Sequence, residues 1–217
     1  QGSKRKIAED ILRNIPKKIQ GRLFEPFSGS AAITLSAAAK NLADGYVVGD
    51  KYEPLINLWR KVVNNPDDAA REYKILWDSQ LVDPKSFFAE CRSQFNIDND
   101  PVKFLYLVAR CVKNAIRFNS QGEFNQSPDN RRLGTNPDRM RKEMFCASEL
   151  LHSKVDFRVG DFMDILKVIN TVPDEYDTLL IFGHNPGLSN SNVREYIRIY
   201  IELQGILGTL KKHTTIS

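Results

Sequence analysis

Two stretches of alternating strands and helices, one near each end of the chain, restrict the possible folds most strongly. In the N-terminal stretch, the apolar segments 22–27 and 46–50 have strand character, and an Ala- and Leu-rich helical segment lies between them. In the C-terminal stretch, the apolar segments 155–159 and 178–182 flank a short helical pattern. Short apolar strands that alternate with helices are typical of a parallel sheet covered by helices on both faces. The sequence therefore predicts an α/β fold with a doubly wound, mostly parallel sheet.

The middle of the chain follows a different pattern. From about residue 61 to about residue 150, apolar residues recur with helical period, and strands do not alternate with helices. We interpret 61–150 as a helical insertion in an α/β domain formed by 1–60 and 151–217. A chain of 217 residues is long enough for one domain that carries such an insertion.

Positive charge is concentrated in one part of this helical insertion. The whole chain has a net charge of +4, whereas residues 103–142 contain nine Lys and Arg residues and three Asp and Glu residues. A local basic excess of this kind is typical of a surface that binds phosphates, and a solvated helical face is the alternative. The same region contains a polar loop, residues 119–136, whose Asn, Gln, Ser and Arg side chains can contact both phosphates and base edges.

The composition argues against several classes of protein. No apolar run approaches the roughly 18 residues that span a bilayer, and the basic N-terminus lacks the apolar stretch of a secretory signal. Three widely spaced cysteines, Cys91, Cys111 and Cys146, fit a reducing compartment and form no metal-binding pair. We expect them to pack in the core. The three histidines are too scattered for a zinc site, so we expect a cytoplasmic protein without a metal or a membrane segment.

A candidate cofactor site follows the first two predicted strands. The small residues Ser28-Gly29-Ser30-Ala31-Ala32 allow the backbone to approach a ligand closely and begin a helix whose N-terminal amides face it. Asp50 ends the second strand, 21 residues after Gly29, where its carboxylate can accept both hydroxyls of an adenosine ribose. Together these features favour a nucleoside cofactor over an ordinary turn. The missing GxGxxG motif and the missing Lys-Ser/Thr pair argue against nicotinamide and triphosphate ligands.

Five segments resemble, in order, the motifs of the Dam-like (D12 class) DNA adenine-N6 methyltransferases. They are Gly2-Ser3-Lys4-Arg5, Phe24-Glu25-Pro26-Phe27-Ser28-Gly29-Ser30-Ala31, Gly49-Asp50-Lys51-Tyr52-Glu53-Pro54-Leu55-Ile56, Arg117-Phe118-Asn119-Ser120-Gln121-Gly122-Glu123-Phe124-Asn125 and Arg158-Val159-Gly160-Asp161-Phe162. The resemblance implies a Rossmann-like methyltransferase fold, S-adenosyl-L-methionine as cofactor and double-stranded DNA as substrate. It also implies a role in restriction-modification and a bacterial or phage protein that associates with the nucleoid.

The resemblance also implies roles for individual residues. Lys4 would contact the methionine moiety of the cofactor, Asp50 its ribose and Asp161 its adenine amino group, while Glu25, Phe27 and Gly29 would line the pocket. Residues 61–150 would form the DNA target-recognition domain. Its candidate DNA-binding residues are Arg117, Asn119, Gln121, Gly122, Phe124, Asn125, Arg131 and Arg132. Phe124 or Gln121 would fill the space that a flipped base leaves in the duplex.

The segment after the fourth predicted strand departs from the family's catalytic motif. The family has an Asp, Asn or Ser followed by two prolines and an aromatic residue, which together accept the N6 hydrogens and stack on the flipped adenine. The best match here is Asn185-Pro186, followed by Gly187 and Leu188. Asn185 and Pro186 are therefore the catalytic candidates. A DNA-binding homologue without catalytic activity and an RNA methyltransferase remain as alternatives. Ala31 is a second departure, since the family has glycine there.

Overall fold

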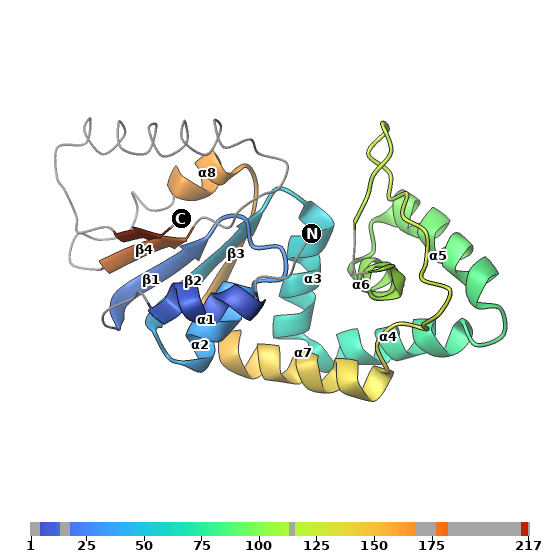
Figure 1. The fold of residues 1–217 in the computed structure, drawn as a ribbon, viewed down its shortest axis with the longest axis horizontal. Helices are drawn as coiled ribbons and strands as arrows, with labels where there is room; N and C mark the ends of the chain where they lie inside the picture. Colours follow the sequence, from blue (N-terminus) through green and yellow to red (C-terminus); the bar gives the residue numbers. More distant parts are fainter. Residues whose placement is uncertain (1–4, 14–17, 113–115, 168–176, 182–213, 217) are drawn as a thin grey trace. The chain divides into compact units, whose positions relative to one another are not determined.

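The computed structural model describes residues 5–13, 18–112, 116–167, 177–181 and 214–216. The chain divides into two compact units (Figure 1). We call Tyr52–Ser153 the helical unit, and the described residues of Ser3–Lys51 and Lys154–Ser217 the sheet unit. The helical unit begins at Tyr52, whereas the interpretation from sequence placed residues up to 60 with the sheet.

The sheet unit contains five parallel strands in the order β3-β2-β1-β4-β5. These are β1 (Ile19–Glu25), β2 (Ala43–Asp50), β3 (Val155–Val159), β4 (Asp177–Ile181) and β5 (Thr214–Ile216). The arrangement confirms the predicted α/β fold with a mostly parallel sheet. The bounds of β1 differ from the predicted 22–27, because Pro26 has no backbone N–H for the ladder and ends the strand. Asp44-Gly45, which has the composition of a turn, lies inside β2.

Helices cover both faces of this sheet. Figure 1 shows α1 (Arg5–Arg13) and α2 (Ala32–Ala39) on one side and α8 (Phe162–Lys167) on the other. Phe24 and Val48 are consequently fully buried. Gly49 allows α8 to pack closely against β2, because a Cβ built there would lie 2.2 Å from Cδ1 of Ile165. The sequence pattern of residues 192–210 predicts a further helix, but these residues lie outside the described part of the chain.

The helical unit consists of helices that mostly begin at a proline. These are α3 (Glu53–Asn64), α4 (Pro66–Ser79), α5 (Pro84–Asp98), α6 (Pro101–Arg110) and α7 (Pro137–Leu151). Proline fixes φ in the first helical turn. Its missing N–H causes no loss there, because the N–H groups of the first turn have no acceptor within the helix. Asp83, Asp100 and Asn136 cap α5, α6 and α7 by accepting hydrogen bonds from backbone N–H groups. The centre of the unit is aromatic: Phe88, Phe95, Phe104 and Tyr106 are almost completely buried.

The cysteines follow the prediction only in part. Cys91 and Cys111 are buried, and burial raises the pKa of each thiol to about 12. Cys146 is exposed, so the prediction that it packs in the core is wrong. It lies on α7, whose buried face passes through the neighbouring Met144 and Ala147 instead. In the part of the chain that the structure describes, no helix is long and apolar enough to cross a membrane, and no cluster of potential ligands could hold a metal ion.

Candidate cofactor site and nucleic-acid interface

The carboxylate of Glu25 is fixed where β1 meets α2. It is completely buried, and its Oε2 accepts hydrogen bonds from the backbone N (3.0 Å) and Oγ1 (2.6 Å) of Thr34. A buried carboxylate is tolerated only when such bonds compensate its lost hydration. Thr34 lies in the first turn of α2, where the helix dipole also favours negative charge. Glu25 is therefore a preorganised polar group at the start of the turn that follows β1.

That turn has a backbone conformation that is typical of loops that bind a ligand. Gly29 and Ala31 both have positive φ values, +48° and +46°. Among the described residues, no atom lies within 4 Å of a Cβ built on Gly29, so they leave the space beside this turn open. The buried Oγ of Ser28 has no hydrogen-bond partner among the described residues. The turn thus combines open space with an unsatisfied polar group, as a ligand-binding loop does.

Asp50 is brought to the same turn by the parallel pairing of β1 with β2. Its Oδ2 accepts a hydrogen bond of 3.2 Å from the backbone N of Gly29. Its backbone O accepts another of 3.1 Å from the N of Gly160, which directly follows β3. Two features identified separately in the sequence, the small-residue turn and the acidic strand end, are therefore in contact.

Asp161 and two aromatic residues complete this edge of the sheet. Asp161 is exposed after β3, and its backbone O accepts hydrogen bonds from Asp164 and Ile165 in α8. The rings of Phe27 and Phe162 stack with centroids 5.4 Å apart. Phe162 was not singled out from the sequence, although its position directly after the acidic residue of the fifth motif could have drawn attention to it.

These residues suit an adenosyl sulfonium ligand chemically. Asp50 offers a carboxylate to a ribose diol, and Phe27 and Phe162 offer an apolar surface. The three carboxylates Glu25, Asp50 and Asp161 complement a cation at sulfur. Lys4, Asn185 and Pro186, the other candidates for cofactor binding and catalysis, lie outside the described residues.

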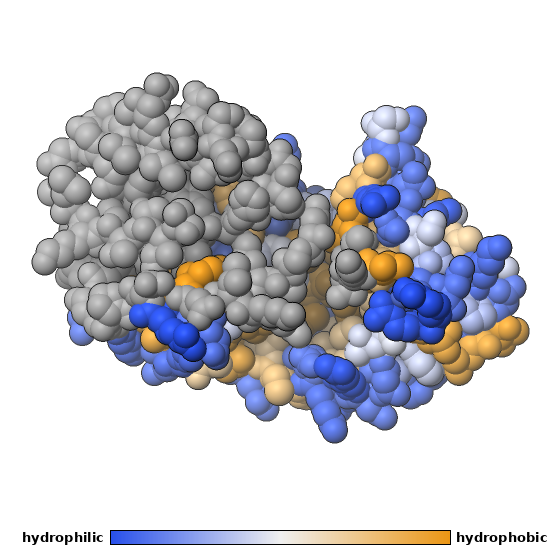
Figure 2. All heavy atoms as spheres, viewed as in Figure 1, coloured by the Kyte–Doolittle hydropathy of each residue, from blue (hydrophilic) through white to orange (hydrophobic). Residues whose placement is uncertain are grey.

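In the helical unit, the motif from Arg117 to Asn125 forms a tight hairpin. Its backbone is paired by hydrogen bonds from the N of Asn125 to the O of Arg117 (2.8 Å) and from the N of Asn119 to the O of Glu123 (2.9 Å). Oδ1 of Asn119 accepts two further bonds, from the N atoms of Gln121 and Glu123. Gly122 supplies the φ of +81° that the turn requires. The hairpin projects from its unit, and its tip is hydrophilic (Figure 2).

Phe124 anchors this hairpin and is not exposed at its tip. It is 1% exposed and packs edge-on against Phe95 and Phe118. The side-chain amide of Asn96 pairs with the backbone N and O of Phe124 at 2.9 and 3.2 Å. The suggestion that Phe124 could fill a gap in a base stack therefore disagrees with its burial. Gln121, the other candidate, is exposed at the tip.

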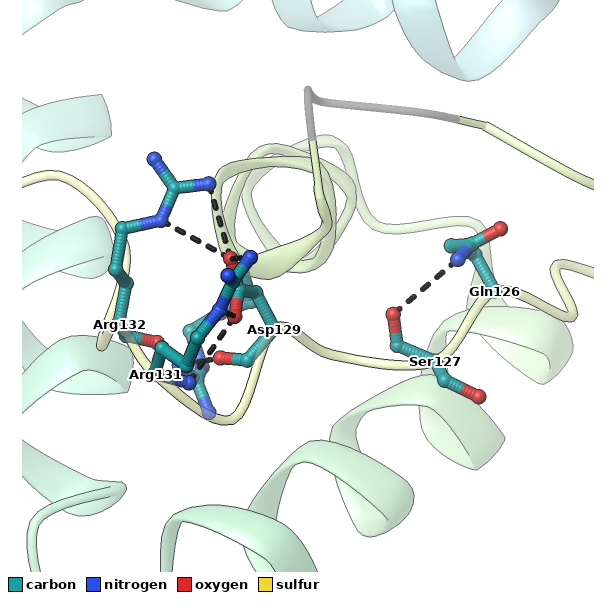
Figure 3. Close-up of polar contacts among 6 residues, drawn as sticks. Gln126, Ser127, Asp129, Arg131 and Arg132 are labelled. Carbon is teal, nitrogen blue, oxygen red and sulfur yellow. Dashed lines mark hydrogen bonds and ion pairs between the residues drawn. The ribbon is translucent and has the colours of Figure 1, made fainter.

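Arg131 and Arg132 share one carboxylate in a turn after the hairpin (Figure 3). Nε of Arg131 donates to Oδ1 of Asp129 at 3.0 Å, and Nε of Arg132 donates to Oδ2 at 3.1 Å. The arginine side chains are 80% and 65% exposed, whereas that of Asp129 is 4% exposed. Hydrogen bonds from Arg131 and then Arg132 hold the pKa of the Asp129 carboxyl well below its usual range.

Buried polar side chains from α4, from its C-cap residue Gln80 and from α6 support this turn. Arg110 is 2% exposed and donates to the backbone O atoms of Asp129 and Arg132. Gln80 donates to the O of Leu133 at 3.0 Å, and Tyr73 donates to the O of Thr135 at 2.8 Å. The turn is therefore held in place along its length, which a solvated loop would not be.

A hollow of about 790 Å³ lies beside the hairpin within the helical unit. Four carboxylates are among the residues that line it: Glu53, Asp98, Asp100 and Glu123. Its acidic lining disfavours a phosphate. The turn that contains Asp129, Arg131 and Arg132, which we call the arginine turn, is consequently a better candidate for phosphate contacts than this hollow.

Comparisons with known proteins agree with the motifs at these positions. The family model of the D12 class N6 adenine-specific DNA methyltransferases matches residues 1–174. The Type II methyltransferase M.MjaIII of Methanocaldococcus jannaschii is 30% identical over 139 residues, which cover 57% of this chain and 48% of that protein. The chain thus spans about half the length of this curated relative.

Among solved structures, the rRNA methyltransferase aviRa from Streptomyces viridochromogenes aligns with a TM-score of 0.41 and 12% sequence identity. The alignment covers 93% of this chain and 70% of that chain. The family assignment depends on the family model, whose match includes the turn after β1, Asp50, the hairpin, the arginine turn and Asp161. The chain belongs to the D12 class of N6 adenine-specific DNA methyltransferases.

Proposed function

We propose that this chain transfers a methyl group from S-adenosyl-L-methionine to the N6 atom of adenine in double-stranded DNA. The observation that carries the proposal is the hydrogen bond between Gly29 and Asp50, which joins a ligand-binding turn to an acidic strand end. In a parallel α/β sheet, ligands bind outside the carboxyl ends of the strands, where both residues lie. Membership of the family supplies the type of reaction.

The sheet unit would hold the cofactor, which when bound supplies a methyl group activated by a positively charged sulfur. Asp50 would accept the ribose hydroxyls, and Asp161 would accept a hydrogen bond from the adenine amino group. Gly29 and Phe27 would line the pocket with Glu25, and Lys4 would contact the methionine carboxylate. The carboxylates of this site would suit a cationic ligand, and the stacked Phe27–Phe162 pair would give the pocket an apolar wall.

The helical unit would bind DNA, with residues 61–150 as the target-recognition part. Arg117, Arg131 and Arg132 would contact phosphates, and Gln121 would enter the space left by a flipped base. Asn119, Gly122, Phe124 and Asn125 would keep the hairpin in the conformation that presents Gln121. A protein with this activity would act on the nucleoid of a bacterium or on phage DNA, in restriction-modification.

Asn185 and Pro186 would form the catalytic motif. The lone pair of the adenine N6 atom is delocalised into the ring, so an acceptor for the N6 hydrogens raises its nucleophilicity as the methyl group is transferred. Asn185 would provide one acceptor with its side-chain oxygen, and the backbone O of Pro186 would provide a second. Leu188 replaces the aromatic residue that stacks on adenine in the family pattern, which favours a slow enzyme or one that only binds DNA.

Calorimetry and a transfer assay distinguish these possibilities. Binding of S-adenosyl-L-methionine, together with transfer of a tritiated methyl group to unmethylated duplex DNA, would support the proposal. Cofactor and DNA binding without transfer would identify a non-catalytic DNA-binding homologue. Transfer to RNA but not to duplex DNA of the same sequence would identify an RNA methyltransferase. If the chain neither binds the cofactor nor transfers a methyl group, all three functions are excluded.

A further inference from the structure

The arginine turn contains an arrangement that simple phosphate binding does not require: a buried carboxylate beneath two exposed guanidinium groups. We propose that Asp129 is a positioning residue that holds Arg131 and Arg132 as one fixed clamp for a single phosphate of the DNA backbone. This inference rests on the proposed function for the identity of the ligand. Figure 3 shows both arginine side chains converging on the Asp129 carboxylate.

Each guanidinium group presents the same edge to Asp129. Arg131 donates through Nε to Oδ1 (3.0 Å) and through Nη2 to Oδ2 (3.3 Å). Arg132 directs Nε and Nη2 to Oδ2, both at 3.1 Å. Among the described residues, nothing binds the Nη1 group of either side chain. Two sets of N–H donors therefore remain directed away from the carboxylate, on side chains that are mostly exposed.

The carboxylate itself is fixed by the backbone around it. Oδ1 accepts a hydrogen bond from the backbone N of Arg131 at 3.0 Å. The backbone N of Asp129 donates to the O of Arg110 at 2.7 Å, and Arg110 donates back to the O of Asp129 at 3.3 Å. Gly134, with φ +86°, allows the chain to pass close to the backbone O of Ala109. Asp129 is thus attached to the end of α6 and can hold the arginines in a constant geometry.

Preorganisation explains why a negative group would be useful at a DNA contact. An exposed arginine loses most of its rotamer freedom when it binds a phosphate, and this loss weakens the contact. Side chains that are already ordered avoid much of this loss, and the guanidinium fork matches the oxygens of a phosphate. Two arginines and one aspartate have a net charge of +1, which complements the single negative charge of a phosphodiester.

Removing the charge of Asp129 changes the affinity for DNA in opposite directions, depending on whether Asp129 positions the arginines or acts only through its charge. Asp129→Asn removes a negative charge, so electrostatics alone predicts tighter DNA binding. It also weakens the contacts that order both arginines, so the proposal predicts weaker binding. Asparagine retains a side-chain oxygen for the backbone N of Arg131, which preserves the turn. Asp67→Asn is the matched control, because Asp67 forms an exposed ion pair with Arg141 at 3.1 Å in the same unit.

The experiment measures the affinity of the full chain for duplex DNA by fluorescence anisotropy across a salt series. We expect Asp129→Asn to weaken binding about tenfold and to lower the slope of log K against log salt by about one. Asp67→Asn should bind like the parent or slightly more tightly. In an Arg131→Ala/Arg132→Ala background, Asp129→Asn should cause no further loss, because the groups that it positions are absent.

A second variant keeps the test independent of folding. Arg131→Lys/Arg132→Lys changes only exposed side chains and retains their charge, yet removes the fork that Asp129 orders. We expect it to weaken binding severalfold and to be insensitive to Asp129→Asn. Parent-like or tighter DNA binding by Asp129→Asn would overturn the inference. It would also be overturned if Asp129→Asn still weakened DNA binding in the Arg131→Ala/Arg132→Ala background. A parent chain that binds DNA but transfers no methyl group would refute the proposed function alone. A parent that binds no DNA would refute both.

Discussion

The backbone N of Gly29 donates a hydrogen bond of 3.2 Å to Oδ2 of Asp50, which is 21 residues further along the chain. This bond keeps the acidic side chain at the mouth of the turn after β1. The parallel pairing of β1 and β2 fixes the end of β2, and a hydrogen bond of 2.9 Å from the N of Ser28 to the O of Gly49 attaches the turn to it, so the contact is built into the fold. The cofactor would therefore bind to a site that already has much of its final geometry.

The first prediction concerns Asp50. Two charge-assisted hydrogen bonds to a ribose each contribute on the order of 1.5–3 kcal/mol. Asp50→Ala should therefore weaken S-adenosyl-L-methionine binding at least tenfold, as measured by calorimetry, while the fold remains intact. Asp44→Ala, which removes a half-exposed carboxylate from the same strand, is the control and should bind like the parent. An unchanged dissociation constant for Asp50→Ala would mean that the cofactor binds elsewhere.

The second prediction concerns Ala31, whose left-handed conformation costs a residue with a Cβ about 1–2 kcal/mol. Ala31→Gly relieves that strain and adds about 0.5–1 kcal/mol of unfolded-chain entropy, so the two effects nearly cancel. We expect the free energy of unfolding in urea to be unchanged or up to about 1 kcal/mol higher. Ala38→Gly, inside α2, should instead lose about 1 kcal/mol. Equal losses in both variants would show that Ala31 is not strained.

The contact between Gly29 and Asp50 could be predicted from the sequence, because the end of each apolar strand can be recognised from the residues next to it. Gly29 and Asp50 each follow an apolar strand, and parallel pairing brings such positions together. Burial in the helical unit was less predictable. Phe124 lies in a polar loop, and its burial depends on Phe95 and Asn96, nearly 30 residues earlier. In the same way, only Arg110 and the fold of α6 show that Asp129 is a buried partner of two arginines.

The third prediction concerns the exposed arginines of the helical unit. Arg117→Ala, Arg131→Ala and Arg132→Ala should each weaken duplex binding and reduce the salt slope by about one, because Arg117 would contact one phosphate and the loss of either Arg131 or Arg132 would open the clamp on another. Cofactor affinity should not change, since that site is built from residues of the sheet unit. Arg71→Ala is the control, because Arg71 is exposed on α4 and pairs with Asp68. If all three variants bind DNA like the parent across the salt series, the basic cluster is only a solvated surface.

The fourth prediction separates the two residues proposed to enter the base stack. Phe124→Ala should lower the free energy of unfolding by about 3–5 kcal/mol, because it leaves a cavity among buried rings. Gln121→Ala should leave stability unchanged and reduce base flipping, measured as the fluorescence of 2-aminopurine at the target position. Ser120→Ala provides the control at the hairpin tip. Parent-like fluorescence with Gln121→Ala would contradict the role of this side chain.

The identity of the methylated nucleoside is the most direct test of the proposed reaction. The full chain is incubated with tritiated S-adenosyl-L-methionine and unmethylated duplex DNA, and the DNA is then digested to nucleosides and separated by liquid chromatography with mass detection. We expect label in N6-methyldeoxyadenosine, reduced for Asp50→Ala at low cofactor concentration and restored when the cofactor concentration is raised. Label in another nucleoside, label only in an RNA of the same sequence, or label that is unaffected by Asp50→Ala would contradict this expectation.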